Sequence, residues 1–244
     1  VSVLDYLQNG DYRMFVGCDN NNIYGFYKNG KPLPGWKPLR TGSMQVSPMM
    51  HVLSEGKDYL VYITASDQLF IRNRKGSNRT SPVPLQGELI TELAFDSKED
   101  ATMLLGVNEN GDLVRYYLDG TSDKSPLGTD IIDAVLSDVD GDGSTDVVYM
   151  DQSGLHAITN TGMSIFNFDP GAPSAFRLGS ITGKEVNYIT LSSIVTQETY
   201  ILDGNGKPIH SEVLPASGYT NGLYDPERKA VIASESLIQC FVIR

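Results

Sequence analysis

The chain has few cysteines, no long apolar run and no helix-favouring composition, and each shortage excludes a class of protein. Its 244 residues contain two cysteines, Cys18 and Cys240, too few for a disulfide framework or for a zinc site built on thiolates. No apolar run approaches the roughly 20 residues that span a bilayer, so the sequence predicts no transmembrane segment. The two cysteines are compatible with one disulfide or with two buried thiols. The second reading is favoured, because cysteine is a common core residue.

Positive charge is also scarce. The sequence has 19 Lys and Arg against 30 Asp and Glu, a formal net charge of −11. Binding to nucleic acid needs clustered Lys and Arg that neutralise phosphates, and this chain has no such cluster, so we expect no nucleic-acid partner. The acidic balance is compatible with the binding of cations.

What the chain does contain is typical of β-structure. It has 24 Gly, 12 Pro and 13 Tyr, with many Val, Ile and Thr, which favours strands joined by turns. Five stretches repeat the order apolar strand, polar turn, second strand and glycine turn, as in LVYITASDQLFIRNRKG. The glycines that close these stretches are Gly30, Gly76, Gly120, Gly162 and Gly206. A sixth copy begins at Ala230.

The interval between these glycines, about 44 residues, is typical of a four-stranded propeller blade. We therefore predict an all-β fold, a β-propeller of about six four-stranded blades in one domain. The alternative is a pair of β-sandwich domains, which would not require a constant period. The approximate blades are 1–43, 44–87, 88–129, 130–171, 172–217 and 218–244. The last blade is short of its outer strand, so either one blade has three strands or the chain is part of a longer protein.

The strongest local motif is SDVDGDGSTDVVYM, residues 137–150. Asp138, Asp140 and Asp142 stand at alternate positions, and Asp146 follows as a fourth carboxylate. Calcium takes about six to eight hard oxygen ligands, so short carboxylates at this spacing predict a calcium site, with the Ser144 carbonyl as a further ligand. Magnesium fits less well, because it retains waters in place of an all-protein cage. The alternative is an acidic surface turn without an ion, but four carboxylates so close together repel one another unless a cation is present.

The loop does not belong to an EF-hand. An EF-hand places a bidentate Glu at position twelve, where this chain has Tyr149, and strand-like residues flank the loop in place of helices. The stretch DVDGDGSTDVV resembles the D-x-D-x-D-G-x-x-D core of FG-GAP/VCBS-type repeats, which build the propellers of integrin α-subunits and of many secreted bacterial proteins. The resemblance implies that Asp138, Asp140, Asp142, Ser144 (through its carbonyl) and Asp146 hold Ca²⁺. We expect the protein to work outside the cytoplasm, where calcium is plentiful enough to occupy a weak site.

The other blades lack the full motif. The first blade keeps Asp5, Asn9 and Gly10 in register, but Leu7 and Arg13 replace two carboxylates. Arg13 is therefore a candidate to supply the positive charge that calcium would add there.

No familiar catalytic signature occurs, and the three histidines, His51, His156 and His210, fall in different blades. We expect a non-enzymatic binding or assembly module whose rim loops contact a protein or a glycan. The alternative is a carbohydrate-active enzyme, a polysaccharide lyase or a glycoside hydrolase. Its candidate carboxylates are Glu88, Glu92, Glu109 and Asp112, although a solvated surface position is the default expectation for each. Aromatic residues are expected in the core, except that Trp36 suits a blade-edge platform equally well.

Overall fold

The computed structural model describes residues 1–7, 9–96, 102–182, 187–193, 195–196 and 198–209, together with the backbone of four strands between 214 and 242. Within these residues the protein is built of strands, with one short 3₁₀ helix at Pro173–Ala175. No helix in this part of the chain is long and apolar enough to cross a membrane.

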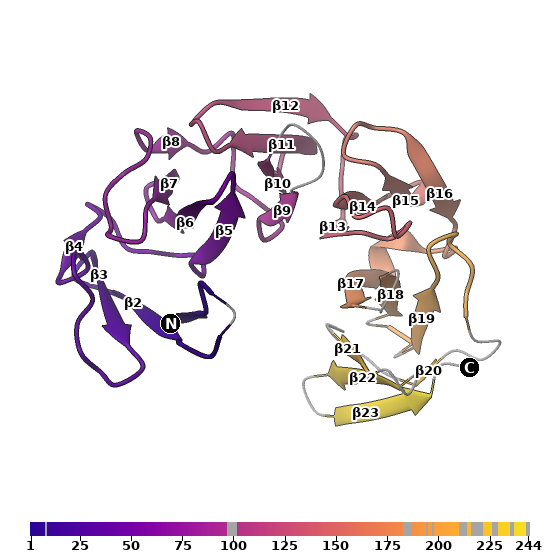
Figure 1. Cartoon of the computed structure of the whole chain (residues 1–244). Coiled ribbons are helices and arrows are strands. Elements are labelled where there is room, and N and C mark those ends of the chain that lie inside the picture. Colours follow the sequence, from indigo (N-terminus) through magenta and orange to yellow (C-terminus); the bar gives the residue numbers. More distant parts are fainter. Residues whose placement is uncertain are drawn as a thin grey trace. The chain divides into compact units, whose positions relative to one another are not determined.

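The strands follow one another as four-stranded sheets (Figure 1). The first sheet contains β1 (Ser2–Leu4), β2 (Arg13–Cys18), β3 (Asn22–Tyr27) and β4 (Leu39–Arg40). The second contains β5 (Met50–Ser54), β6 (Lys57–Thr64), β7 (Gln68–Arg72) and β8 (Val83–Pro84). The third contains β9 (Ala94–Asp96), β10 (Met103–Val107), β11 (Asp112–Tyr117) and β12 (Ser122–Pro126). The fourth contains β13 (Asp133–Ser137), β14 (Asp146–Asp151), β15 (Gly154–Ile158) and β16 (Ser164–Phe168).

The last strands form one seven-stranded sheet. Its first four strands are β17 (Phe176–Thr182), β18 (Tyr188–Ser193), β19 (Glu198–Leu202) and β20 (Leu214–Pro215). Its other three are β21 (Gly222–Asp225), β22 (Lys229–Ser234) and β23 (Leu237–Val242). β17 pairs with β21 in parallel, whereas β17 to β20 and β21 to β23 pair antiparallel. The predicted sixth copy is thus a β-hairpin preceded by one more strand.

The sequence repeat corresponds to a repeated turn. Each of the five closing glycines donates its N–H to the carbonyl three residues earlier: Gly30 to Tyr27, Gly76 to Asn73, Gly120 to Tyr117, Gly162 to Thr159 and Gly206 to Asp203. All five have φ between 74° and 93°, the left-handed region that glycine enters without steric cost. The period of about 44 residues is therefore the recurrence of one turn between the third and fourth strands of each sheet.

The chain divides into two compact units. The N-terminal unit comprises Val1–Glu88, Glu99–Leu104 and Val114–Lys124, and the C-terminal unit comprises Leu89–Lys98, Leu105–Leu113 and Ser125–Arg244. Each has its own apolar core, with Phe15 and Leu60 in the first and Val148 and Leu191 in the second. Strands such as β14 bury residues on both faces, which explains why alternation in the sequence is weak.

Trp36 belongs to the core of the N-terminal unit. Its side chain is fully buried, its ring meets Phe15 edge-on at a centroid distance of 4.8 Å, and its Nε1 donates a 2.9 Å hydrogen bond to the Arg74 carbonyl. A Cβ on Gly25 would lie 2.7 Å from the Trp36 Cβ, so glycine is needed there for the indole to pack. The structure therefore decides between the two expectations for Trp36 in favour of the core.

The structure describes the side chain of one of the two cysteines. Cys18 is a free, half-buried thiol on β2. Cys240 lies on β23, outside the residues whose side chains the structure describes.

Candidate metal centre

The acidic loop joins β13 to β14 at the end of the fourth sheet. Ser137, the last residue of β13, pairs with Asp146, the first residue of β14, so residues 138–145 form the connection between them. Gly141 and Gly143 have φ of 79° and 88°, and they allow the chain to reverse within this short span.

Backbone N–H groups of the loop orient its carboxylates. Asp138 accepts hydrogen bonds from the Gly141 N–H at 2.9 Å and the Gly143 N–H at 3.0 Å. Asp140 accepts from the Asp142 N–H at 3.0 Å, and Asp142 accepts from the Ser144 N–H at 2.7 Å. Each short carboxylate thus folds back over its own loop, which is why Asp rather than the longer Glu occurs at these positions.

Three of the four predicted carboxylates converge. Asp138, Asp140 and Asp146 each offer an oxygen, and the three oxygens all lie within 4.8 Å of one another. Asp142 is exposed and lies outside this trio, and Ser144 is half-buried. The trio matches the first, third and ninth positions of the motif.

Asp146 has one carboxylate oxygen that is satisfied and one that is not. Its side chain is fully buried, and its Oδ2 accepts from the Val139 N–H at 2.9 Å and the Asp140 N–H at 3.4 Å. Its Oδ1 is buried and has no hydrogen-bond partner among the described residues. A buried carboxylate oxygen without a donor is costly, and a cation beside Asp138 and Asp140 would remove that cost. The residues present therefore fit a hard cation such as Ca²⁺.

The electrostatics of the trio also reflect uncompensated negative charge. Burial, together with the charges of Asp140 and Asp138, raises the pKa of Asp146 to about 7 despite the N–H bond from Val139. Without a cation, the folded protein thus holds a proton on Asp146 up to near-neutral pH.

This raised pKa predicts a pH dependence for the metal-free protein. The pKa of Asp146 is about 7 in the folded state and about 3.9 in an unfolded chain, so the folded state binds this proton more tightly. The resulting stabilisation is complete below about pH 4 and is lost as the pH rises through 7. In EDTA, the wild-type Tm should fall between pH 5.5 and pH 8 by several degrees more than the Tm of Asp146→Asn. Parallel melting curves of the two proteins by calorimetry would contradict this.

Neighbouring sheets hold the loop in place. The Thr145 N–H donates to Oδ2 of buried Asp96 on β9 at 3.1 Å, and the Asn160 amide donates to the same oxygen. The Asp138 carbonyl accepts from the Asn187 N–H at 3.1 Å. A Cβ on Gly204 would lie 2.2 Å from the Val139 carbonyl oxygen, so only glycine allows this approach. These residues could not be predicted from the sequence, because each lies more than 40 positions from its partner and carries no local signal.

The histidines form local networks of their own. His51 Nε2 lies 2.7 Å from Oδ1 of Asp58, and His156 Nδ1 lies 2.8 Å from Oδ1 of Asn167. His156 Nε2 also lies 2.9 Å from the Ser153 hydroxyl, an arrangement with the outline of a nucleophile and base. The Ser153 hydroxyl lies closer, at 2.6 Å, to Oδ1 of Asp151, and an ionised carboxylate oxygen can only accept a hydrogen bond. The Ser153 proton is thus directed to Asp151. His210 lies outside the described residues.

The carboxylates considered for an enzyme are exposed or half-buried. Glu88, Glu92 and Glu109 are exposed, and Asp112 is half-buried and bonded to Asn108. Among the described residues, the acidic trio in 138–146 is the group of carboxylates that converges on one point.

Comparison with solved structures identifies the architecture. The BBS1N chain in a crystal structure of BBS1N in complex with ARL6DN is similar over 100% of this chain and 91% of that one, with a TM-score of 0.60 and 11% identity. The four-stranded sheets and this likeness decide the fold. The chain has a β-propeller fold.

Two further propeller structures are similar. BamB from Moraxella catarrhalis matches 95% of this chain and 79% of that one, with a TM-score of 0.51 and 13% identity. A streptogramin B lyase matches 100% of this chain and 82% of that one, with a TM-score of 0.56 and 12% identity. No family model matches the chain, and no curated protein matches it. At these identities the likeness concerns the propeller fold.

Proposed function

We propose that this protein is a non-enzymatic propeller module that binds or assembles with a protein partner and carries one structural Ca²⁺ in the loop 138–146. The observation that carries the metal assignment is the buried, unpartnered Oδ1 of Asp146 beside Asp138 and Asp140. Asp142 and the Ser144 carbonyl complete the ligand set, as the FG-GAP/VCBS resemblance implies. When bound, Ca²⁺ supplies positive charge that draws the carboxylates together.

The role of the metal in this proposal is mechanical. The loop contacts Asp96 on one side and Gly204 on the other, so an ordered loop connects the third, fourth and fifth sheets. No helix pair flanks the loop, and the elements that it joins are strands of one sheet. Ca²⁺ therefore stabilises the packing of sheets and does not act as a switch.

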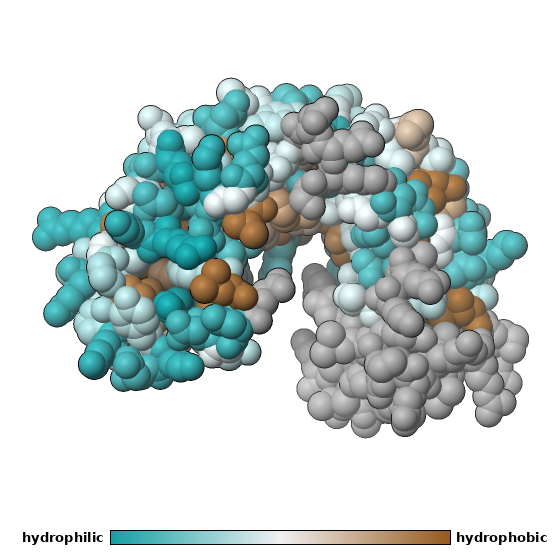
Figure 2. Space-filling view, viewed as in Figure 1, coloured by the Kyte–Doolittle hydropathy of each residue, from teal (hydrophilic) through white to brown (hydrophobic). Residues whose placement is uncertain are grey.

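Binding of a protein partner is supported by the surface of the N-terminal unit. Leu7 and Leu53 are 64% and 57% exposed, and they lie in or beside the connections between the first two strands of their sheets. Figure 2 shows apolar groups that interrupt the otherwise hydrophilic surface of this unit. Exposed apolar side chains on rim loops are suited to contact with a protein. The similar BBS1N propeller was crystallised in a complex with ARL6DN.

A glycan partner is less well supported. Trp36, the residue best suited to stack on a sugar, is buried, so the aromatic platform considered from the sequence is absent at that position. An extracytoplasmic location follows from the proposed site, because calcium is abundant enough there to occupy a loop of moderate affinity.

Calorimetric titration tests the metal site. Wild-type protein stripped with EDTA should bind one Ca²⁺, and Asp140→Ala combined with Asp142→Ala should abolish the binding heat. Asp130→Asn is the matched control, because Asp130 is an exposed aspartate outside the loop with φ of 58°, a conformation that Asn tolerates. Wild-type protein that gives no binding heat at millimolar Ca²⁺ would refute the site.

A further inference from the structure

The connection between β1 and β2 is the structural counterpart of the acidic loop. The last residue of β1, Leu4, pairs with the first residue of β2, Arg13, just as Ser137 pairs with Asp146 in the fourth sheet. Eight residues separate the paired positions in both sheets. Arg13 therefore stands where Asp146 stands in the fourth sheet.

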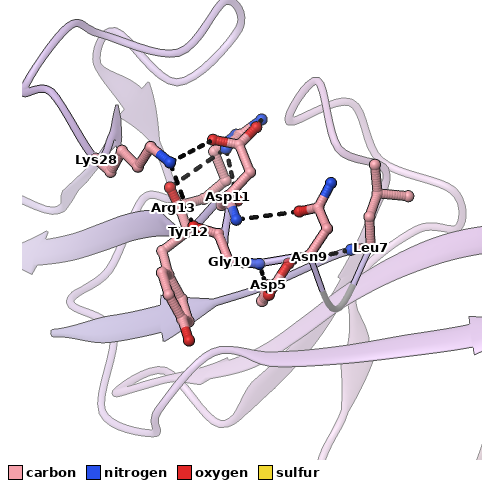
Figure 3. A network of polar contacts seen from close by, with 8 residues as sticks. All are labelled: Asp5, Leu7, Asn9, Gly10, Asp11, Tyr12, Arg13 and Lys28. Atoms are coloured by element: carbon pink, nitrogen blue, oxygen red, sulfur yellow. Dashed lines mark hydrogen bonds and ion pairs between the residues drawn. The ribbon is translucent and has the colours of Figure 1, made fainter.

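The two loops also share hydrogen bonds. The Asp5 carboxylate accepts from the Gly10 N–H at 2.7 Å, as Asp138 accepts from Gly143 five residues later (Figure 3). The Asn9 side chain accepts from the Asp11 N–H at 3.0 Å, as Asp142 accepts from Ser144. Two hydrogen bonds of the acidic loop are thus retained in a loop that keeps one carboxylate, Asp5, at the four positions of the predicted ligand carboxylates.

The Arg13 guanidinium contacts Asp11, the residue at the position of Ser144 in the acidic loop. Its Nη1 donates to the Asp11 carbonyl at 2.7 Å, and Asp11 is the counterpart of Ser144, whose carbonyl is a proposed calcium ligand. Its Nη2 lies 2.8 Å from Oδ2 of Asp11, and only 16% of the Arg13 side chain is exposed. The guanidinium also lies over the Tyr27 ring, 4.7 Å from its centroid.

Lys28 adds a second positive charge near the Asp11 carboxylate. Lys28 Nζ lies 3.4 Å from the Gly10 carbonyl and 3.9 Å from Oδ1 of Asp11 (Figure 3). Two cations, Arg13 and Lys28, therefore lie against Asp11, while the Asp5 carboxylate accepts from the Leu7 and Gly10 N–H groups. The acidic loop of the fourth sheet has four carboxylates and no cation among residues 138–146.

From this correspondence we propose that the Arg13 guanidinium replaces the metal ion of the first loop, which makes that loop independent of calcium. The contrast with residues 138–146 rests on the proposed calcium site, but the role of Arg13 does not. As a result, exposed Leu7, at the counterpart of Asp140, is presented in the same conformation with and without calcium. Calcium dependence is confined to the C-terminal unit.

Hydrogen exchange measured by mass spectrometry tests this proposal on the whole chain. In wild-type protein, Ca²⁺ should slow exchange in peptides that cover 136–150 and leave peptides that cover 3–17 unchanged. Arg13→Gln should raise exchange in 3–17 at least several-fold, equally in EDTA and in Ca²⁺. Lys37→Gln, which removes an exposed cation of the same sheet outside this network, should leave both regions unchanged.

Either of two outcomes would overturn the proposal. One is that Ca²⁺ slows exchange in 3–17 of the wild-type protein, and the other is that exchange in 3–17 of Arg13→Gln equals that of the wild type. If 136–150 does not respond to Ca²⁺ while Arg13→Gln opens 3–17, the calcium assignment fails and the role of Arg13 stands.

A gain-of-function variant provides a second, independent test. Leu7→Asp combined with Arg13→Asp rebuilds the acidic pattern around Asp5 and Asn9. The double variant should exchange faster than wild type in 3–17 in EDTA and should gain protection there when Ca²⁺ is added. If the double variant in EDTA protects 3–17 as well as the wild-type protein does, the loop needs no cation and the proposal is refuted.

Discussion

Asp146→Asn should abolish the stabilisation by Ca²⁺ and raise the Tm of the metal-free protein at pH 8. In the wild type, an ionised and fully buried carboxylate lies beside Asp138 and Asp140 with one oxygen unpartnered. Asn removes this charge, its Oδ1 can still accept from Val139, and its amide can donate to the two remaining carboxylates. Removal of a buried uncompensated charge is worth about 1–4 kcal/mol, which is about 2–16 °C for a chain of this size.

The measurement is a pair of thermal melts, in EDTA and in Ca²⁺, for wild type, Asp146→Asn and the control Asp130→Asn. Wild type and the control should gain several degrees on addition of Ca²⁺, whereas Asp146→Asn should gain none. An Asp146→Asn protein that is less stable than wild type in EDTA at pH 8 would mean that the carboxylate is satisfied without a metal. A retained calcium response would exclude Asp146 as a ligand.

Trp36→Ala should destabilise the N-terminal unit by about 3–5 kcal/mol, the cost of emptying a large buried aromatic site. The indole is fully buried against Phe15, and Gly25, which packs against Trp36, has no side chain that could fill the emptied space. Urea denaturation followed by circular dichroism would measure the loss, which should not depend on Ca²⁺.

Trp36→Phe separates packing from hydrogen bonding. It retains most of the apolar volume but leaves the Arg74 carbonyl without its indole donor, so we expect a smaller cost of about 1–2 kcal/mol. If Trp36→Ala and Trp36→Phe both cost less than about 1 kcal/mol, the indole is not part of the core.

Strands and turns were predictable because their signals are local. The turn at each closing glycine needs a positive φ within a few residues, and this requirement recurs at Gly30, Gly76, Gly120, Gly162 and Gly206. A sheet of four strands then follows from short strands joined by short turns. The parallel pairing of β17 with β21 carried no such signal, since it joins residues about 40 positions apart.

Part of the candidate metal centre was predictable for the same reason. The spacing of Asp138 and Asp140, and the glycines between them, are local requirements of a cation loop. Asp142 and Asp146 were predicted from the sequence to be equivalent ligands. In the structure, Asp142 is exposed and Asp146 is fully buried. This difference arises because Asp146 begins β14, a strand with both faces packed.

The order of the residues alone thus determined the strands, the repeated glycine turn and the acidic loop, since each depends on dihedral angles and spacings within about ten residues. The unpartnered oxygen of Asp146, the contacts of the loop with Asp96 and Gly204, and the burial of Trp36 were decided only by the tertiary structure. Burial and hydrogen-bond satisfaction depend on neighbours that the fold brings together from distant parts of the chain.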